Sequence, residues 1–545
     1  MTEGLLVWVL AAPLAGAAAA LAGKLFRSLE PWAKIVSTAS LAVSGVALAL
    51  LAAPVMNGEV LSYQLGSWPE PVGIALVLDG IGWVSAALTT VIAVAVAVFS
   101  LGRKRYTGGF FFFLMMLISG MYGVALTGDL FTMFVCFEII AVSVYVLIAW
   151  EGTATGLAAS LKYLILSTTG ILFFLLGIFL VYRDLGVLSL SMISHALAGT
   201  GGASNTRVMH LALASLCVGI GVRTAFIPFH TWLPEAHAYA PHPISAILSG
   251  ALIKVSLFAM VRILLQFQGE YLFPLLMWIG GATALLAAVS AVAQSDAKRL
   301  LAYSSISQLG YMLAVFAAGS SIALTASFFH AVNHALFKAL LFLTVGAAVT
   351  VTGERNLFRM PRMGGRMPIF AVAFFIGALS ISGIPPFNGF ASKVYITQGM
   401  KGSPAYPLLW ITGILTIASF IKLSRIFLPG RRTGETEGLP GKAQTAAVTA
   451  LALGCVATGV FGEGCAGFLN RILYGEPLLT GPAVLSAGNV LKTLLPAALG
   501  VGMWRLVLTG TGARVSGRIR AMAPQLQVVL VFFLAGFLAF AAAAY

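Results

Sequence analysis

The sequence predicts an all-α polytopic membrane protein of about sixteen transmembrane helices, with two inverted five-helix repeats that each contain a broken helix. Three observations support this fold class. First, 59% of the 545 residues are hydrophobic and only 9% are charged, whereas a soluble domain carries about 25% charged residues. Second, apolar runs of about 20 residues, the length that spans a bilayer as a helix, recur along the whole chain. Third, the basic residues between these runs fall mainly on one side of the membrane.

Sixteen apolar runs define the predicted helices in chain order. The first run follows only Glu3, with no basic residue before it, so we interpret it as a span and not as a signal peptide. The polar stretches between runs are at most about 25 residues long, so no separate soluble domain is expected. The predicted spans lie at about 4–23, 32–55, 76–101, 109–127, 129–150, 157–182, 207–228, 243–267, 272–294, 300–318, 322–350, 367–399, 405–428, 443–462, 484–510 and 524–545.

The distribution of Lys and Arg supports this number of spans. Of the 32 basic residues, 19 fall in loops on one side of the threaded chain, and only Arg183, Arg207, Lys401 and Arg471 fall on the other. The positive-inside rule assigns the side with 19 to the cytoplasm, which places both termini on the non-cytoplasmic side of the cell membrane. The net charge of +15 therefore reflects loop bias, and we expect no nucleic-acid partner.

No pattern in the chain predicts a cofactor. The four cysteines are scattered without metal-ligand spacing, and there is no phosphate-binding glycine loop. His330 and His334 are four residues apart but lack a nearby third zinc ligand. We therefore expect no metal, no cofactor and no catalytic residue on this chain.

Two of the predicted spans contain helix breaks. The segment "GVRTAFIPFHTWLPEAHAYAPHP" ends the seventh run, and "GALSISGIPPFNGFASKVYI" lies inside the twelfth. Proline interrupts a helix, and irregular backbone at membrane depth is tolerated only where it is buried in protein or lines a wet cavity. The breaks fall on the fourth span of each of two blocks, residues 109–267 and 272–428, five spans apart. Five is odd, so the blocks have opposite orientations, as in transporters with inverted repeats. Helices 1–3 precede the blocks in residues 1–108, and the C-terminal helices follow in residues 443–545.

Charged residues inside the apolar runs are candidates for an ion path. Glu138 lies nine residues after Asp129, which is about 14 Å along a helix. Lys254, Lys338 and Lys393 also lie inside runs or directly after a break. Each such charge costs about 2.5–3.5 kcal/mol on insertion scales, so buried partners or internal water must compensate. We predict that these residues form an ion-translocation path; the alternative is a set of structural ion pairs.

His330, His334 and Lys338 recur every four residues and therefore share one helix face. Imidazole titrates near neutral pH and has two nitrogens, which suits a proton relay. A lysine can join such a relay when burial brings its pKa toward neutrality. We therefore expect this face to carry protons.

Several other charged residues have two open interpretations. The cluster His230, Glu235, His237 and His242 at the first break either caps the cytoplasmic mouth or only faces solvent. Asp296, Lys298 and Arg299 lie at the cytoplasmic edge, where a relay role and ordinary snorkelling of the basic pair are both open. Snorkelling is an open interpretation for Arg262 and Lys422, near span ends, and for Lys162, five residues into its span; Asp79 is expected at the interface. For Lys162 we favour a place on the path, because its span occupies the same block position as that of Lys338.

Five motifs, in the same order, give the chain a family likeness over about residues 73–430. The sequence resembles the antiporter-like subunits of respiratory complex I, a protein type that also occurs in Mrp multisubunit cation/proton antiporters and in membrane-bound hydrogenases. This resemblance implies two inverted five-helix bundles and a mid-membrane polar axis that moves protons or sodium. The motifs are "TGDLFTMFVCFEIIAVSVYVLIA", "FIPFHTWLPEAHAYAPHPISAILSGALIKV", "DAKRLLAYSSISQLGYM", "HAVNHALFKALLFL" and "GIPPFNGFASK".

The resemblance also implies roles for individual residues. One position departs from the family, which usually has a lysine that pairs with the fifth-helix glutamate; here the residue is Arg223. Arginine stays protonated, so Arg223 is expected to gate Glu138 electrostatically and not to release a proton. The other matches are Glu138 (fifth-helix glutamate), Lys162 (sixth-helix lysine), Lys254 (eighth-helix lysine), His330, His334 and Lys338 (central relay) and Lys393 (charged residue of the broken twelfth helix).

These features together predict a proton- or sodium-translocating membrane subunit of a multisubunit redox-driven pump or Mrp-type complex. Its partners would be other membrane subunits and, in the redox case, a peripheral iron–sulfur or hydrogenase arm. One alternative is a secondary sodium/proton antiporter with no redox partner. An alternative of another class is a membrane scaffold whose buried charges are only structural. The two spans beyond Ala483 lie outside the fourteen-helix core and are expected to brace a neighbouring subunit.

Overall fold

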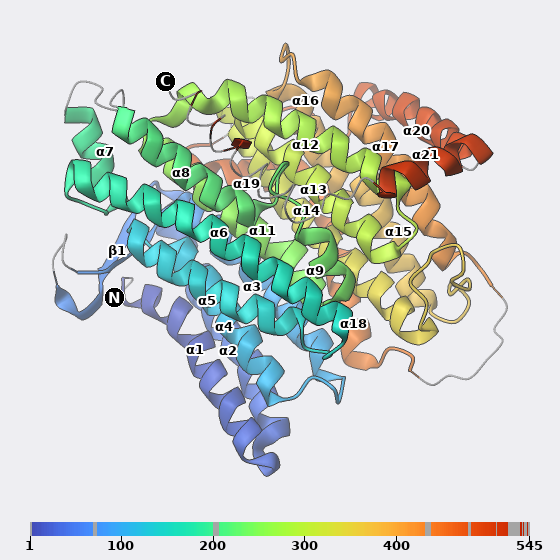
Figure 1. Cartoon of the computed structure of the whole chain (residues 1–545), viewed down its shortest axis with the longest axis horizontal. Helices are drawn as coiled ribbons and strands as arrows, with labels where there is room; N and C mark the ends of the chain where they lie inside the picture. The colour runs from blue at the N-terminus through green and yellow to red at the C-terminus, as the bar shows by residue number, and fades with distance from the viewer. Residues whose placement is uncertain are drawn as a thin grey trace.

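A computed structural model of the protein describes residues 3–68, 73–199, 207–430, 438–477, 481–507 and 509–521, together with residues 535, 536, 538 and 542. Over these ranges the chain is almost entirely helical, and its long helices pack side by side (Figure 1). In this part of the chain, 13 helical segments are long and apolar enough to cross a membrane. Two further predicted spans are also helical: Ala297–Phe316, which has a polar face, and the broken pair around Gly383. The sixteenth predicted span, 524–545, falls almost wholly outside the described residues.

The N-terminal region consists of three long helices and a small hairpin. The hairpin strands pair antiparallel, with Leu61 opposite Leu78. Asp79 begins the third helix, because its carboxylate accepts a hydrogen bond from Gly82 N at 2.7 Å. The elements are α1 (Gly4–Leu25), α2 (Glu30–Met56), β1 (Leu61–Gln64), β2 (Ala75–Leu78) and α3 (Gly80–Leu101).

The first bundle follows, and short polar side chains cap the starts of two of its helices. Asp129 accepts from Thr132 N at 2.7 Å and Thr153 accepts from Gly156 N at 3.1 Å, which satisfies amides that the first helical turn leaves free. The elements are α4 (Gly108–Leu126), α5 (Leu130–Ile148), α6 (Ala154–Leu185), α7 (Leu190–Gly199), α8 (Arg207–Thr224), α9 (Leu233–Tyr239), α10 (His242–Ile247), a π-helical turn (Leu248–Leu252) and α11 (Ile253–Gln266).

The second bundle and the C-terminal helices complete the described chain. Helix α14 crosses the middle of the molecule and packs against α13, α16 and α18. The elements are α12 (Phe273–Ala293), α13 (Ala297–Phe316), α14 (Ser321–Thr352), α15 (Pro368–Ser382), α16 (Asn388–Gly399), α17 (Tyr406–Ser424), α18 (Lys442–Val460), α19 (Gly462–Tyr474), α20 (Ala487–Val507) and α21 (Gly510–Ala521).

The structure confirms both predicted helix breaks. Helix α8 ends at Thr224, and the chain is irregular until α9 begins at Leu233. Helix α15 ends before Gly383, which adopts φ +76°, and α16 begins at Asn388. Each break is tied to another helix by hydrogen bonds. Ile227 N donates to Thr283 Oγ1 on α12 at 3.1 Å, and the Asn388 amide exchanges hydrogen bonds with Asn333 on α14.

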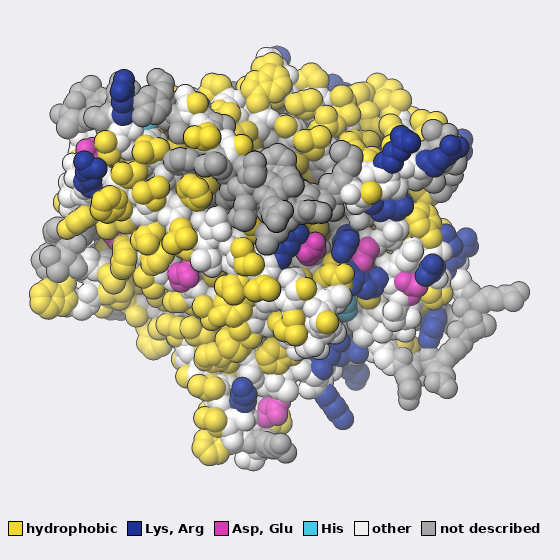
Figure 2. Space-filling view, viewed as in Figure 1, with side chains coloured by type: hydrophobic (Ala, Val, Ile, Leu, Met, Phe, Trp, Pro, Cys, Tyr) yellow, Lys and Arg dark blue, Asp and Glu magenta, His cyan; other side chains and the backbone are white. Residues whose placement is uncertain are grey.

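The outer surface matches a protein surrounded by lipid. Hydrophobic side chains cover most of the face in Figure 2, and Lys and Arg gather along its lower right. Exposed large apolar residues occur on many of the outer helices, including Trp32 at 68% and Val372 at 62%. Such exposure is unfavourable in water and normal against hydrocarbon.

The prediction that Arg262 and Lys422 snorkel is wrong, because both side chains are buried among carbonyl oxygens. Arg262 bonds Asp79 Oδ2 at 2.9 Å, and it also donates to the carbonyls that end α4, Ala125 O at 3.2 Å and Thr127 O at 2.9 Å. Lys422 donates to Val292 O at 2.5 Å and to Gln294 O at 2.6 Å, at the end of α12. Carbonyls at a helix C-terminus have no partner within the helix and attract cations, so these residues join helix ends.

We predict that Arg262→Met destabilises the protein by about 3 kcal/mol, because it leaves the Asp79 carboxylate and two carbonyls without their partner. The thermal unfolding midpoint of the purified protein in mild detergent measures this loss. Arg359→Met is the matched control, since Arg359 is exposed, and a change below about 0.5 kcal/mol is expected there. Equal midpoints for both variants would contradict the role given to Arg262.

Candidate functional site

Lys254 lies at the start of α11, directly after the π-helical turn, and is completely buried. Its ammonium donates to the carbonyl oxygen of Ser249 within that turn. The Ser249 hydroxyl in turn lies 2.7 Å from the Ser305 hydroxyl on α13. π-Helical turns widen the backbone spiral and recur at functional sites. Here the turn directs a lysine and a serine toward α13.

Lys338, in the middle of α14, reaches the same part of α13. Its Nζ donates to Leu301 O at 2.9 Å and to the Ser304 hydroxyl. Ser305 also donates to Leu301 O, at 3.0 Å. Lys338 is bonded directly to this group of oxygens, and Lys254 reaches it through Ser249, whose carbonyl accepts from the lysine and whose hydroxyl lies next to Ser305. We call Leu301 O, Ser304, Ser305 and Gln308 the α13 polar face.

His330 connects the α13 polar face to the second broken helix. Its Nε2 lies 2.9 Å from Gln308 Oε1, and its Nδ1 lies 2.9 Å from Ser392 Oγ on α16. Ser392 directly precedes Lys393. His334 lies between His330 and Lys338 on the same face of α14, with its ring centroid 6.2 Å from that of His330. The imidazole relay predicted from the four-residue spacing therefore faces the interior.

His334 has an unusual environment. It is fully buried, and neither ring nitrogen has a hydrogen-bond partner among the described residues. Lys254 and Lys338 both act on it electrostatically. Buried polar atoms are nearly always hydrogen-bonded to protein or to water. We therefore expect water molecules at the ring nitrogens of His334, and this water would connect the imidazole to Lys254 and Lys338.

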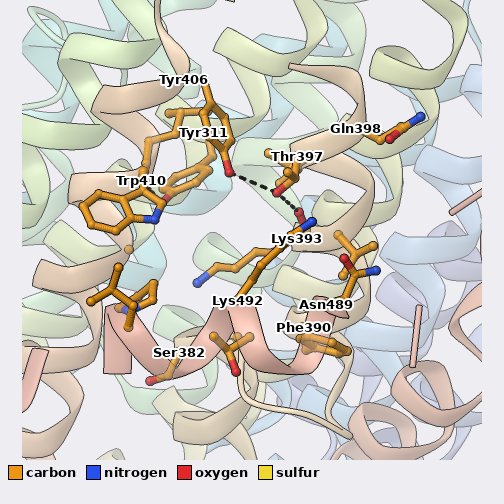
Figure 3. Close-up of a pocket in the computed structure, with 18 of the residues that line it drawn as sticks. Tyr311, Ser382, Phe390, Lys393, Thr397, Gln398, Tyr406, Trp410, Asn489 and Lys492 are labelled. Atoms are coloured by element: carbon orange, nitrogen blue, oxygen red, sulfur yellow. Dashed lines mark hydrogen bonds between the residues drawn. The ribbon is translucent and has the colours of Figure 1, made fainter. Parts of the chain in front are cut away.

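Lys393 lies at the second break. Its Nζ donates to Ile381 O at 2.9 Å, a carbonyl in the last turn of α15. Gly383 turns the backbone directly beneath the lysine, and a Cβ at this position would lie 2.7 Å from Lys393 Cδ. The side chain borders a cavity of about 390 Å³ together with Tyr311, Thr397 and Tyr406 (Figure 3). Lys393 therefore has contact with the interior relay on one side and with open space on the other.

In the first bundle, Arg223 Nη2 on α8 lies 3.4 Å from Glu138 Oε1 on α5. The guanidinium also lies over the Phe137 ring, 4.7 Å from its centroid. Arg223 is 4% exposed, whereas the Glu138 side chain is 44% exposed. The structure brings the predicted pair together but corrects the expectation that Glu138 is enclosed by this chain. Helix α5 lies on the outer side of the bundle, and its neighbours Phe131 and Val142 are also exposed.

A second ion pair joins Lys162 on α6 to Glu235 on α9, with Nζ and Oε1 3.0 Å apart. It borders a polar pocket of about 190 Å³ that His230, Asp296 and Arg299 also line. These residues therefore form the wall of an opening, which favours the mouth interpretation over simple exposure for His230 and Glu235.

The other charged residues near the first break are buried and do not face solvent. His237 is fully buried and stacks on Phe342, with ring centroids 4.6 Å apart. Lys298 is 2% exposed and donates to Ala240 O at 2.6 Å, so snorkelling does not describe it. His242 Nε2 lies 2.6 Å from Thr350 Oγ1 on α14.

Sequence reasoning missed the hydroxyl and amide groups that join the charged residues. Ser249, Ser392 and the α13 polar face had no assigned role, because single serines are common in transmembrane helices. A signal was present in "YSSISQ", where Ser304, Ser305 and Gln308 recur at the spacing of one helix face within a transmembrane run.

The chain is similar to membrane proteins of one family. Residues 127–421 match the family described as NADH:quinone oxidoreductase/Mrp antiporter, transmembrane. The NADH-quinone oxidoreductase subunit N of Desulforudis audaxviator is 32% identical over 508 residues, which cover 88% of this chain and 99% of that protein. The D-type subunit of the Na⁺/H⁺ antiporter of Alkalihalophilus pseudofirmus is 30% identical over 385 residues, which cover 68% of this chain and 77% of that protein.

Solved structures with the same fold include a chain of the Mrp complex from Dietzia sp., with a TM-score of 0.79 and 24% identity. A chain of the membrane-bound sulfane sulfur reductase, an archaeal respiratory membrane complex, has a TM-score of 0.78 and 25% identity. Each alignment covers 91% of this chain and 99% of the other.

We predict that Gly383→Ala displaces Lys393 and abolishes ion transport, in addition to a backbone cost of about 1–2 kcal/mol for a side chain at positive φ. Gly402→Ala is a matched control, since Gly402 has φ +80° and open space around its Cβ position. Both variants should lose similar stability in thermal unfolding, and only Gly383→Ala should lose transport in membrane vesicles. Normal transport by Gly383→Ala would contradict the proposed position of Lys393 on the path.

Proposed function

Because the chain belongs to the NADH:quinone oxidoreductase/Mrp antiporter transmembrane family, we propose that it moves protons through Lys254, His334, Lys338, His330 and Lys393 as a membrane subunit of a multisubunit complex. Lys162 and the Glu138–Arg223 pair belong to the first bundle and act at its uptake side. The observation that carries this proposal is the meeting of three groups at one α13 polar face: Lys338 and His330 bond to it directly, and Lys254 reaches it through Ser249. Ser392, the other partner of His330, directly precedes Lys393.

The free energy available from a change in a neighbouring charge is similar to the free energy needed to move a proton against a membrane potential. A neighbouring charge shifts a protonation equilibrium by about 1.4–4 kcal/mol. Moving one charge against 100 mV costs about 2.3 kcal/mol. Opening and closing the Glu138–Arg223 pair therefore changes the field in the first bundle by enough to move a proton at Lys254 against a membrane potential.

Arg223 acts in this scheme through its charge alone. A guanidinium does not give up its proton in a protein, and the 3.4 Å pair with Glu138 is single and loose. A loose pair separates at lower cost than a bidentate one, which suits a gate. Proton loading and release fall to the lysines and histidines.

The chemistry of the path favours protons over sodium. Na⁺, like other hard cations, needs several oxygen ligands, with carboxylates prominent among them. The titratable groups of the path from Lys254 to Lys393 are amines and imidazoles, and the carboxylates of the first bundle, Glu138 and Glu235, are each paired with a cation. Ammonium groups repel Na⁺ and exchange protons readily.

The exposed side of Glu138 supports a neighbouring membrane protein on α5. A carboxylate that faces lipid is costly, and this one is 44% exposed in the isolated chain. A polar surface of another subunit against α5 removes that cost. The predicted position of both termini on the non-cytoplasmic side remains part of the proposal.

The source of energy distinguishes two versions of the complex. A redox-driven pump parallels the respiratory relatives, and a secondary antiporter parallels the D-type subunits of Na⁺/H⁺ antiporters. Two experiments distinguish them. Iron–sulfur subunits that co-purify with the protein in mild detergent support the pump. Uncoupler-sensitive sodium exchange without any redox substrate supports the antiporter.

We predict that Lys254→Met lowers proton flux in inverted membrane vesicles by about 10- to 100-fold while the complex still assembles. Lys422→Met is a contrasting buried control, since Lys422 caps α12; it should lower the thermal unfolding midpoint and leave the flux per assembled complex nearly unchanged. If Lys254→Met transports normally, the charges are structural and the scaffold alternative stands.

We also predict that Arg223→Lys retains proton flux, because the positive charge beside Glu138 is kept, whereas Arg223→Met loses it. Proton flux in inverted membrane vesicles compares both variants with the unaltered protein. Equal flux for Arg223→Met and the unaltered protein would remove the gate from the mechanism.

A further inference from the structure

The cavity beside Lys393 contains a second lysine that the path does not yet include. Lys492 on α20 and Lys393 on α16 both line it, and both side chains lie within the space in Figure 3. Lys393 is six residues from the end of α16 at Gly399, and Lys492 is five residues from the start of α20 at Ala487. At 1.5 Å per residue, each lies about 8–9 Å from its helix end. Both lysines therefore lie within the first two turns from the nearer end of their helices.

Among the described residues, the lining contains no acidic side chain to neutralise these two cations. On α17, Tyr406 is hydrogen-bonded to Thr397 of α16 at 3.3 Å, and on α13, Tyr311 donates to Leu409 O. Glu463 in the adjoining α19 is engaged with Val484 N at 2.7 Å and does not line the cavity. The charged groups that face the cavity are therefore two amines, with phenols, amides and hydroxyls around them.

Two ammonium groups that border one cavity without a carboxylate repel each other. A space of about 390 Å³ is ample for a chain of water molecules between them. Such a chain of water joins the two amines across the cavity and lets a proton pass from one to the other.

We propose that this cavity is the release outlet of the path and that Lys492 is its last proton-carrying group. The inference rests on the proposed function. In the transfer step the Lys393 ammonium gives its proton through water to the neutral Lys492 amine, and Lys492 then gives it to bulk water. The net charge of the pair is unchanged in the first step and falls by one in the second. Helix α20 lies beyond the fourteen-helix core, so these C-terminal residues contribute to transport and not only to bracing.

The competing explanation is that Lys492 merely snorkels near the end of an outer helix. Flux measurements in inverted vesicles, with the whole complex present, distinguish the two. Lys492→Gln should lower proton flux about tenfold. Lys492→Arg should lower it similarly, because arginine keeps the charge but does not release a proton. Arg505→Gln, which removes a cation at the other end of the same helix, should stay within about twofold of the unaltered protein.

Water access provides a readout that does not depend on flux. Lys492→Cys should react with a charged, membrane-impermeant thiol reagent added from the non-cytoplasmic side, and Leu491→Cys, one residue away and outside the lining, should react far more slowly. A Lys492→Gln or Lys492→Arg variant with normal flux, or Lys492→Cys that reacts no faster than Leu491→Cys, would overturn the outlet.

The flux of these variants also distinguishes a failure of this inference from a failure of the proposed function. If Lys254→Met and Lys393→Met lose flux while Lys492→Gln keeps it, the relay stands and the outlet is wrong. If all three variants transport normally, the proposed function itself fails and the outlet fails with it. Assembly of each variant is checked by native gel electrophoresis, so flux is expressed per assembled complex.

Discussion

An ammonium group inside hydrocarbon must have oxygen atoms around it, and this requirement organises the centre of the protein. Lys254 and Lys338 come from different bundles, and neither has a carboxylate as its hydrogen-bond partner in the described structure. Lys254 instead relies on the Ser249 carbonyl, and Lys338 on the Leu301 carbonyl and the Ser304 hydroxyl. Neutral oxygens stabilise a cation less than a carboxylate does, and they bind a neutral amine nearly as well. A lysine held this way is bound less tightly as a cation than it would be by a carboxylate, which suits a group that has to pass its proton on.

Irregular helices supply many of these oxygens. A regular α-helix engages its carbonyls in its own hydrogen bonds, and only its C-terminal end leaves them free. Lys254 uses a carbonyl in a π-helical turn, and Lys393 uses one at the end of α15. Arg262 and Lys422 use the ends of α4 and α12 in the same way, but their contacts are several and they join helices. The cations that join helices, Arg262 and Lys422, thus have more oxygen partners than Lys254 and Lys393, to which we assign proton transfer.

The sequence was sufficient for the fold class and for most of the charged residues. The length of the apolar runs and the charge of the loops identify the membrane spans, because the bilayer determines both. The two proline-rich segments mark the helix breaks. The contacts between spans could not be predicted from the sequence. The face of α13 that meets Lys338 depends on how the helices pack, and no local sequence pattern encodes that packing. The same limit explains the error at Arg262, whose partners lie in α4 and at Asp79, more than a hundred positions earlier in the chain. The exposure of Glu138 was also missed, because a carboxylate in an apolar run looks identical whether it faces inward or outward.

The outward carboxylate of Glu138 has a consequence for how the protein is made. A newly inserted chain carries this carboxylate on its outer face before any neighbouring subunit binds. The lone protein therefore exposes a polar group to the lipid. The residue assigned to transport in the finished complex therefore makes the unpartnered chain less stable in the bilayer than the partnered one.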